Sequence, residues 1–224
     1  MAFSLIDKNN KNKWENKIDE MIATSYSLSE WEANALKAVK ILNKLLKDKR
    51  IEYPEGDHYS IGNVYNTLGI AHSHISSSKN ILIHIKYYNY SINLLEKIND
   101  SNLLANAYNN LGSAYAQIGD IDNLKKAIVY FDKSSRIYSK LPVLHPAIST
   151  SYYNTCLAYS QLTGKENILM AIKYCEKSLQ VRFKLFSGDY EYVDEVLNTL
   201  LSLYTILNDG DEIQKSKNRI KTIT

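Results

Sequence analysis

Glycine and proline are scarce in this chain, which has 8 Gly and 3 Pro among its 224 residues. That is too few for the many tight turns of an all-β fold or for long structureless linkers. Hydrophobic residues make up 45% of the chain and charged residues 23%, which are ordinary proportions for a soluble globular protein. The composition therefore favours a helix-rich chain with a core of ordinary size.

The chain also lacks an excess of charge of one sign. Its formal net charge is +3, and basic and acidic residues are interleaved along most segments, so no broad basic face for nucleic acid is expected. The only cysteines are Cys156 and Cys175, too few for a disulfide framework. We expect two buried thiols that fill a helix–helix contact in a reducing compartment, with a redox pair as the less favoured alternative.

Long hydrophobic runs are absent as well. The first residues contain no apolar stretch typical of a secretory signal, and no uninterrupted apolar run approaches the roughly 20 residues that span a bilayer. These absences predict a cytoplasmic protein with no membrane partner.

Motifs of catalysis and metal binding are missing too. The chain has no glycine-rich phosphate loop, His-Glu-x-x-His or Gly-x-Ser-x-Gly motif, so we expect neither enzymatic activity nor a cofactor. His72, His74 and His84 are close in sequence, but a structural zinc ion requires about four converging ligands. We interpret these histidines as packed or solvated side chains and predict no metal site.

What the sequence does contain is an internal repeat. Similar segments of eight residues begin at Tyr65, Tyr108, Tyr152 and Leu197, so the interval is 43 to 45 residues. A second string follows each of the first three copies, opening at His84, Ala127 and Ala171, with a serine seven residues later at Ser91, Ser134 and Ser178. Because the register holds in both halves of the unit, chance similarity is an inadequate explanation.

The spacing within each copy is helical. In the second copy, Tyr108, Leu111, Gly112 and Tyr115 fall at i, i+3, i+4 and i+7, which places them on one face of a helix. The partner string that opens at Ala127 has the same spacing. Turn-forming or helix-breaking pairs separate these helices at Gly119-Asp120, Leu141-Pro142, His145-Pro146 and Thr163-Gly164.

These residues resemble the tetratricopeptide repeat (TPR), whose signature is a large residue, Leu-Gly, Tyr, a Gly turn, and then Ala, an aromatic residue and Ala. The match is best at Tyr108, Leu111, Gly112, Tyr115, Gly119, Ala127 and Phe131. Two features differ, because the period is longer and serine occupies the final small position. The longer unit is similar to the subclass found in kinesin light chains and in bacterial signalling and protease-associated TPR proteins.

The resemblance covers roughly residues 59–208 and implies an all-α fold, a right-handed superhelix (α-solenoid) of TPR-like helical hairpins. We expect a flexible N-terminal tail at 1–12 and a single TPR-like solenoid over 13–224. Its parts are an irregular first pair at 13–50, repeats at about 59–100, 103–141 and 146–187, and a terminal repeat and cap at 190–224.

The resemblance also indicates a binding surface, because the first helix of each TPR pair lines a concave groove. The residues it selects are Asn63, Asn66, Asn106, Asn109, Asn110, Tyr153, Asn154, Glu195 and Asn198. A primary amide both donates and accepts hydrogen bonds, so a row of them can pair with an extended peptide backbone whatever its side chains. The alternative is that asparagine is simply a tolerated surface residue in an Asn-rich chain. None of the inward positions is basic, which disfavours the carboxylate clamp of chaperone adaptors in this family.

The sequence therefore favours a non-catalytic adaptor whose Asn-lined groove holds an extended segment of another protein, such as a protease, effector or signalling protein. One alternative is a structural subunit or inhibitor that binds through its ends or convex face, where Trp14, Trp31, Tyr87 and Tyr90 are candidates. A second alternative is an RNA- or nucleotide-binding sensor that uses Tyr87, Tyr90 and Tyr153. It is disfavoured, since most tyrosines fall on repeat positions that the core should bury.

Overall fold

The structure is a computed structural model that describes residues 21, 32–75, 80–99, 101–185 and 191–207. The predicted tail at 1–12, most of the first helix of the irregular pair and residues 208–224 of the predicted terminal repeat and cap lie outside these residues, as do Trp14 and Trp31.

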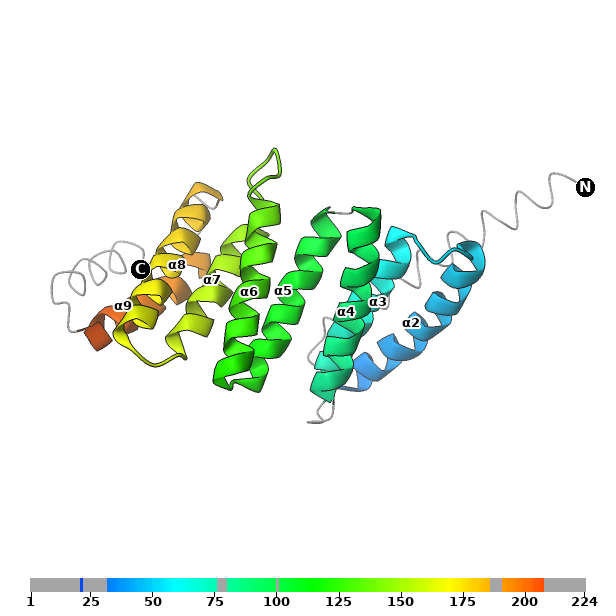
Figure 1. Ribbon diagram of the computed structural model, residues 1–224, viewed down its shortest axis with the longest axis horizontal. Coiled ribbons are helices and arrows are strands. Elements are labelled where there is room, and N and C mark those ends of the chain that lie inside the picture. The colour runs from blue at the N-terminus through cyan, green and yellow to red at the C-terminus, as the bar shows by residue number, and fades with distance from the viewer. Residues whose placement is uncertain (1–20, 22–31, 76–79, 100, 186–190, 208–224) are drawn as a thin grey trace, which may run out of the picture. The chain divides into compact units, whose positions relative to one another are not determined.

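The described residues form helices and contain no β-strand (Figure 1). The helices are α2 (Glu32–Glu52), α3 (Tyr59–Ser73), α4 (Asn80–Ile98), α5 (Ser101–Ile118), α6 (Ile121–Tyr138), α7 (Ala147–Ser160), α8 (Lys165–Leu185) and α9 (Glu191–Leu207). This confirms the predicted all-α class. Within the described parts of the chain, no helix is both long enough and apolar enough to cross a membrane.

The chain divides into two compact units, residues 1–107 and 108–224, with the boundary inside α5. In the first unit, α3 packs against α2 and α4. In the second unit, α7 packs against α6 and α8, and α8 packs against α9. Figure 1 shows α3 beside α4 and, in the second unit, α7 beside α8. The repeated unit is therefore a helical hairpin.

Local sequence signals set where these helices begin. Asp120 caps α6, because its carboxylate accepts a hydrogen bond from the backbone N–H of Asn123 at 2.9 Å. The preceding Gly119 has a φ of +82°, a conformation that glycine adopts without steric cost. Pro146 stands directly before α7, where its missing N–H costs no helical hydrogen bond.

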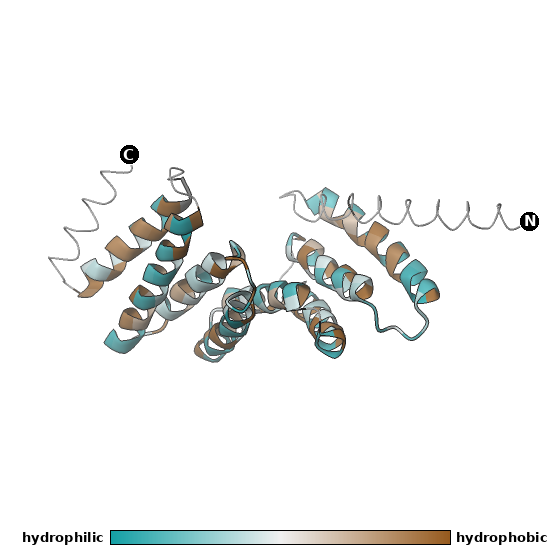
Figure 2. Cartoon of the chain, turned by 90° about the horizontal axis from the view of Figure 1, so that it is seen from above, coloured by the Kyte–Doolittle hydropathy of each residue, from teal (hydrophilic) through white to brown (hydrophobic). Residues whose placement is uncertain are grey.

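The repeated leucines form the core of both units. The side chains of Leu68, Leu111 and Leu200 are at most 1% exposed, which confirms the predicted helical register. Figure 2 shows hydrophobic and hydrophilic residues on each helix, as expected where one helical face packs inward.

The two helices of a hairpin approach each other most closely at the repeated glycine. A Cβ atom built on Gly112 would lie 2.7 Å from the Phe131 ring, and one on Gly69 would overlap the Tyr88 ring. Only a residue without a side chain allows the ring of the second helix to lie against the backbone of the first. The Leu-Gly pair is therefore a packing requirement of the hairpin.

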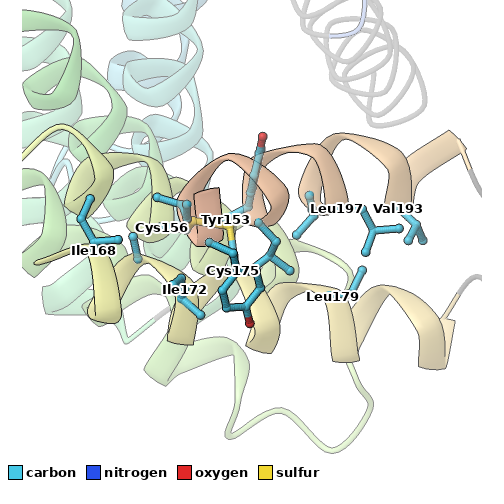
Figure 3. Packing of buried hydrophobic residues seen from close by; sticks show 13 residues of the cluster. Tyr153, Cys156, Ile168, Ile172, Cys175, Leu179, Val193 and Leu197 are labelled. Atoms are coloured by element: carbon cyan, nitrogen blue, oxygen red, sulfur yellow. A yellow bond between two sulfur atoms is a disulfide. The ribbon is translucent and has the colours of Figure 1, made fainter. Parts of the chain in front are cut away.

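In the third hairpin a disulfide takes the place of the contact between glycine and an aromatic ring. Cys156 occupies the glycine position and Cys175 the aromatic position, and the two sulfurs are bonded across α7 and α8 with a Cα–Cα distance of 5.3 Å (Figure 3). The expectation of two free thiols was wrong in this respect, although both residues are fully buried as predicted. The count of cysteines gave no indication of pairing, because pairing depends on two repeat positions that meet only in the folded hairpin.

The serine that replaces the usual alanine of the family also has a structural role. Ser91 and Ser178 are fully buried, and each donates a hydrogen bond of 2.8 Å to a backbone carbonyl of its own first helix, at Gly62 and Ser149 respectively. The third member, Ser134, shares a 2.9 Å bond with the hydroxyl of Ser151. A small hydroxyl side chain thus packs like alanine and adds a bond between helices.

We expect Gly112→Ala to destabilise the second unit by about 1–3 kcal/mol, because overpacking against Phe131 outweighs the helix propensity gained. Urea unfolding followed by circular dichroism measures this change. Gly112→Ala combined with Phe131→Leu should recover part of the loss, since the smaller side chain leaves room for the methyl group. Independent, additive effects of the two substitutions would contradict direct contact.

Reduction of the disulfide should lower the free energy of unfolding by about 3 kcal/mol, because the bond closes a loop of about twenty residues. The measurement is urea unfolding with and without a phosphine reductant. Replacing the pair by the residues of the second hairpin, Cys156→Gly with Cys175→Phe, should give a protein that is insensitive to reductant. It should also be more stable than the Cys156→Ala, Cys175→Ala double variant. Equal stability of the two variants would show that a glycine–phenylalanine contact cannot replace the disulfide in this hairpin.

Candidate functional site

The second unit brings together the predicted groove residues of three successive first helices. The Asn154 side chain donates a hydrogen bond to the amide oxygen of Asn109 at 3.2 Å, which links α7 to α5. The hydroxyl groups of Tyr153 and Thr199 lie 2.9 Å apart, which links α7 to α9. We call the surface formed by Asn109, Asn154, Tyr153, Asn198 and Thr199 the amide surface.

The amides of this surface are partly used by the protein itself. The amide oxygen of Asn109 accepts a hydrogen bond from Asn154, and the buried hydroxyl of Ser151 lies 3.4 Å from the same oxygen. Both asparagines are half-buried, whereas Asn198 on α9 is exposed. The Asn109–Asn154 bond fixes the orientation of two side chains, which reduces the entropy that a partner would have to remove on binding.

A hollow of about 600 Å³ continues the amide surface along α9. Its volume lies within the range of about 300–1,000 Å³ that is typical of ligand sites. The residues that line it are Ser160, Glu195, Asn198, Thr199, Ser202, Leu203 and Ile206. Amide, hydroxyl and carboxylate groups thus border an apolar floor at Leu203, which is only 2% exposed.

A buried cation lies beneath this surface. The guanidinium carbon of Arg182 on α8 is 5.3 Å from the ring centroid of Tyr153, a cation–π contact, and both residues are less than 10% exposed. Burial lowers the pKa of Arg182, while the negative charge of Glu195 opposes that shift. Burial also raises the pKa of Tyr153, so its phenol stays protonated at neutral pH.

Nothing in the repeat pattern pointed to Arg182. It lies on a second helix, where the repeat pattern assigns residues only to packing. Glu195, in contrast, was predicted, and its exposed carboxylate partly offsets the buried positive charge. The balance of charge at the amide surface therefore depends on Glu195 from a first helix and Arg182 from a second helix.

The remaining predicted residues are half-buried or buried. Asn66 is only 7% exposed, and Asn63 and Asn106 are half-buried; all three belong to the first unit. Asn110 is half-buried in the second unit. These four asparagines already interact with neighbouring groups of the protein. Whether they bind a partner stays a prediction.

Each hairpin also contains a trio of aromatic rings, which we call the aromatic seam. One second-helix tyrosine contacts two first-helix rings, with centroids 5.3 to 6.4 Å apart. The trios are Tyr65–Tyr87–His72, Tyr108–Tyr130–Tyr115 and Tyr152–Tyr174–Tyr159.

This arrangement weakens the RNA-binding alternative. Tyr87 is stacked with Tyr65 and His72, and Tyr153 is buried against Arg182. Bases that stack on a protein need free ring faces, and these two of the three proposed tyrosines already contact other groups. Tyr90 is 43% exposed, but its ring also contacts Tyr65, Tyr87 and the Lys86 ammonium.

The histidines of the first hairpin occupy core positions. His72 stands where the other hairpins have Tyr115 and Tyr159, and His84 stands where they have alanine. Both ring nitrogens of His84, which is 3% exposed, have no hydrogen-bond partner among the described residues. Burial lowers the pKa of His84 to about 4, and the neighbouring His72 adds to that shift. In the part of the chain that the structure describes, no three His, Cys, Asp or Glu side chains are grouped to hold a metal ion.

Comparison with known proteins identifies the fold as TPR-like. No family model and no curated protein matches the sequence. Solved structures of TPR-like repeat proteins do match, so the chain has the helical-hairpin fold of that class. Because the sequence identity is only 15–16%, the likeness shows the fold alone.

The particular structures extend over most of this chain. A candidate kinesin light chain of Podospora anserina with nearly identical TPR-like repeats has a TM-score of 0.70 and 16% identity, with 92% of this chain and 93% of that chain covered. BtubC of P. vanneervenii has a TM-score of 0.71 and 16% identity, covering 86% and 74%. A third structure is the Signal Transduction ATPase with Numerous Domains of Pyrococcus horikoshii, which carries a TPR sensor. It has a TM-score of 0.60 and 16% identity, and the match covers 84% of this chain and 26% of that chain.

The buried histidine predicts an acid-sensitive first hairpin. The pKa of His84 in the folded state is about 4, below the ordinary value of 6.5, so its contribution to stability is complete above pH 6.5 and is lost as the pH falls toward 4. We expect a loss of at most about 3 kcal/mol, measured by urea unfolding between pH 7 and pH 4. His84→Ala, which installs the residue of the other hairpins, should flatten this dependence. An unchanged pH profile in that variant would show that other groups cause it.

Proposed function

We propose that the chain is a non-catalytic protein-interaction module that holds an extended segment of a partner protein on the amide surface. The observation that carries this proposal is the pair of hydrogen-bonded links, Asn109–Asn154 and Tyr153–Thr199, which join three first helices side by side. A surface that crosses three successive helices suits an extended chain better than a compact small molecule.

The chemistry of the surface supports a peptide backbone as the ligand. Its amide and hydroxyl groups include both donors and acceptors, the two functions that match the C=O and N–H groups of a peptide. Each such bond contributes roughly 1 kcal/mol net, so several are needed for micromolar affinity. The hollow along α9, with Leu203 at its floor, would accept an apolar side chain of the partner.

The P. horikoshii protein has a TPR sensor, and two other similar structures are of a candidate kinesin light chain of Podospora anserina. By analogy, a signalling protein, an effector or a protease is a reasonable partner class for this chain. A structural subunit or inhibitor that binds through Tyr87 and Tyr90 remains the second candidate, because Tyr90 is a large exposed aromatic residue.

We expect Asn154→Ala combined with Asn198→Ala to weaken partner binding by about tenfold to a hundredfold, because two backbone-directed amides are lost. The partner is first isolated from the native host by affinity capture and identified by mass spectrometry. Its dissociation constant is then measured by calorimetry with purified proteins. Melting temperature should change little, since Asn198 is exposed and Asn154 half-buried.

The matched control is Gln117→Ala combined with Gln180→Ala, which also removes two amides but from exposed positions outside the amide surface. It should leave affinity unchanged. If the asparagine variant binds as well as the wild type, the amide surface is not the site. Loss of binding in Tyr90→Ala instead would favour the second candidate.

A further inference from the structure

The aromatic seam is covered by lysine in the two hairpins of the second unit. The Lys133 ammonium lies 4.9 Å from the ring centroid of Tyr108 and 5.5 Å from that of Tyr130. Lys177 repeats this arrangement over Tyr152 and Tyr174, at 5.3 and 5.0 Å. In both hairpins the lysine follows the central tyrosine by three residues, so it lies one helical turn further along the same face.

The first hairpin departs from this pattern. Tyr90 stands three residues after Tyr87, where the other hairpins carry lysine. Its ring is tilted by 52° against that of Tyr65, with centroids 5.4 Å apart, and its side chain is 43% exposed. A hollow of about 250 Å³ opens beside these two rings. We call it the Tyr90 hollow; Arg50, Asp57, Ile61, Asn93, Leu94 and Lys97 complete most of its lining.

The charges around the hollow favour an anion. Arg50, in the last turn of α2, donates a hydrogen bond of 2.5 Å to the Tyr65 hydroxyl, which holds its guanidinium beside the rings. Lys97 lies on α4 and pairs with Asp57 at 3.8 Å, but both side chains are more than half exposed, so the pair is weak. Two cations and one carboxylate leave a net positive charge around an aromatic and aliphatic floor.

The hollow of about 250 Å³ has room for one ring with its charged group. The Lys86 ammonium lies 5.7 Å from the centroid of the Tyr90 ring. A planar ring could lie against the part of Tyr90 that Lys86 leaves exposed, and a forked anion could pair with the planar guanidinium of Arg50.

We propose that the Tyr90 hollow is a second binding site, distinct from the amide surface, for a small aromatic anion, an aryl phosphate or aryl carboxylate. Its ring contacts Tyr65 and Tyr90, and its anionic group is held by Arg50 and Lys97. The ligand is either a free small molecule or an aromatic anionic side chain of a peptide, since both present the same chemistry.

Ligand-observed NMR titration of the full chain tests this with three probes: phenyl phosphate, benzyl alcohol and inorganic phosphate. We expect phenyl phosphate to bind at least tenfold more tightly than either of the others, because only it has both ring and anion. A peptide Gly-phosphotyrosine-Gly, compared with free phenyl phosphate, identifies the source: tighter peptide binding indicates a side chain, and tighter phenyl phosphate binding a free molecule.

Substitutions of Lys97 and Asp57 should change the affinity for phenyl phosphate in opposite directions, which partial unfolding could not do. Lys97→Gln should weaken binding of phenyl phosphate severalfold, whereas Asp57→Asn should strengthen it, because an opposing charge is removed. Tyr90→Ala, which removes the ring without adding a charge, should weaken binding at least tenfold while the melting temperature is kept. Asn154→Ala with Asn198→Ala should leave it unchanged. No binding at millimolar phenyl phosphate, or equal affinity in Tyr90→Ala and wild type, would overturn the proposal.

Discussion

The closest contact between the two helices of each hairpin sets the geometry on which the rest of the structure depends. At Gly69 and Gly112 the backbone of the first helix lies against an aromatic ring of the second, and at Cys156 a disulfide takes the place of that contact. Once this crossing point is fixed, Ser91 and Ser178 can bond to the first helix of their own hairpin, whereas Ser134 bonds to Ser151 of the following helix. The aromatic seam and the lysines above it follow from the same register. The polar faces of α5, α7 and α9 are left to form a surface of their own.

Most of the fold could be predicted from the sequence because the repeat supplies several independent copies of the same packing problem. Leu68, Leu111 and Leu200 were assigned to the core by their shared position, and all three are buried. The repeat could not reveal which chemical solution each copy uses. The Cys156–Cys175 bond is invisible to a count of two cysteines, and it becomes understandable only when both are seen to occupy the glycine and aromatic positions. The serine bonds are of the same kind, since a small residue at that position could equally have been alanine.

The candidate site could be predicted less completely, because a repeat position gives the direction of a side chain but not how deeply its neighbours cover it. Asn109, Asn154 and Asn198 were chosen by register, and in the second unit their helices lie side by side. Asn66 and Tyr153 were chosen by the same rule, yet both are more than 90% buried. Arg182 was missed because its contribution comes through a cation–π contact from the packing helix. Electrostatic properties of this kind arise from pairs of residues on different helices, which no single-helix pattern describes.

Departures from the repeat are more informative about individual chemistry than agreement with it. Where the copies agree, as at the core leucine that three of the four copies share, the constraint is packing and the residue carries no information about ligands. Where one copy differs, the others show what packing alone would accept at that position. The other two hairpins have alanine at the position of His84, so the packing of a hairpin does not require an imidazole there. They have lysine at the position of Tyr90, so a lysine side chain can cover the aromatic seam at that position. Both departures lie in the first hairpin, whereas the second unit repeats its seam without change and presents the regular amide surface. The chain thus separates a regular surface suited to a peptide backbone from an irregular hairpin whose chemistry is particular to this protein.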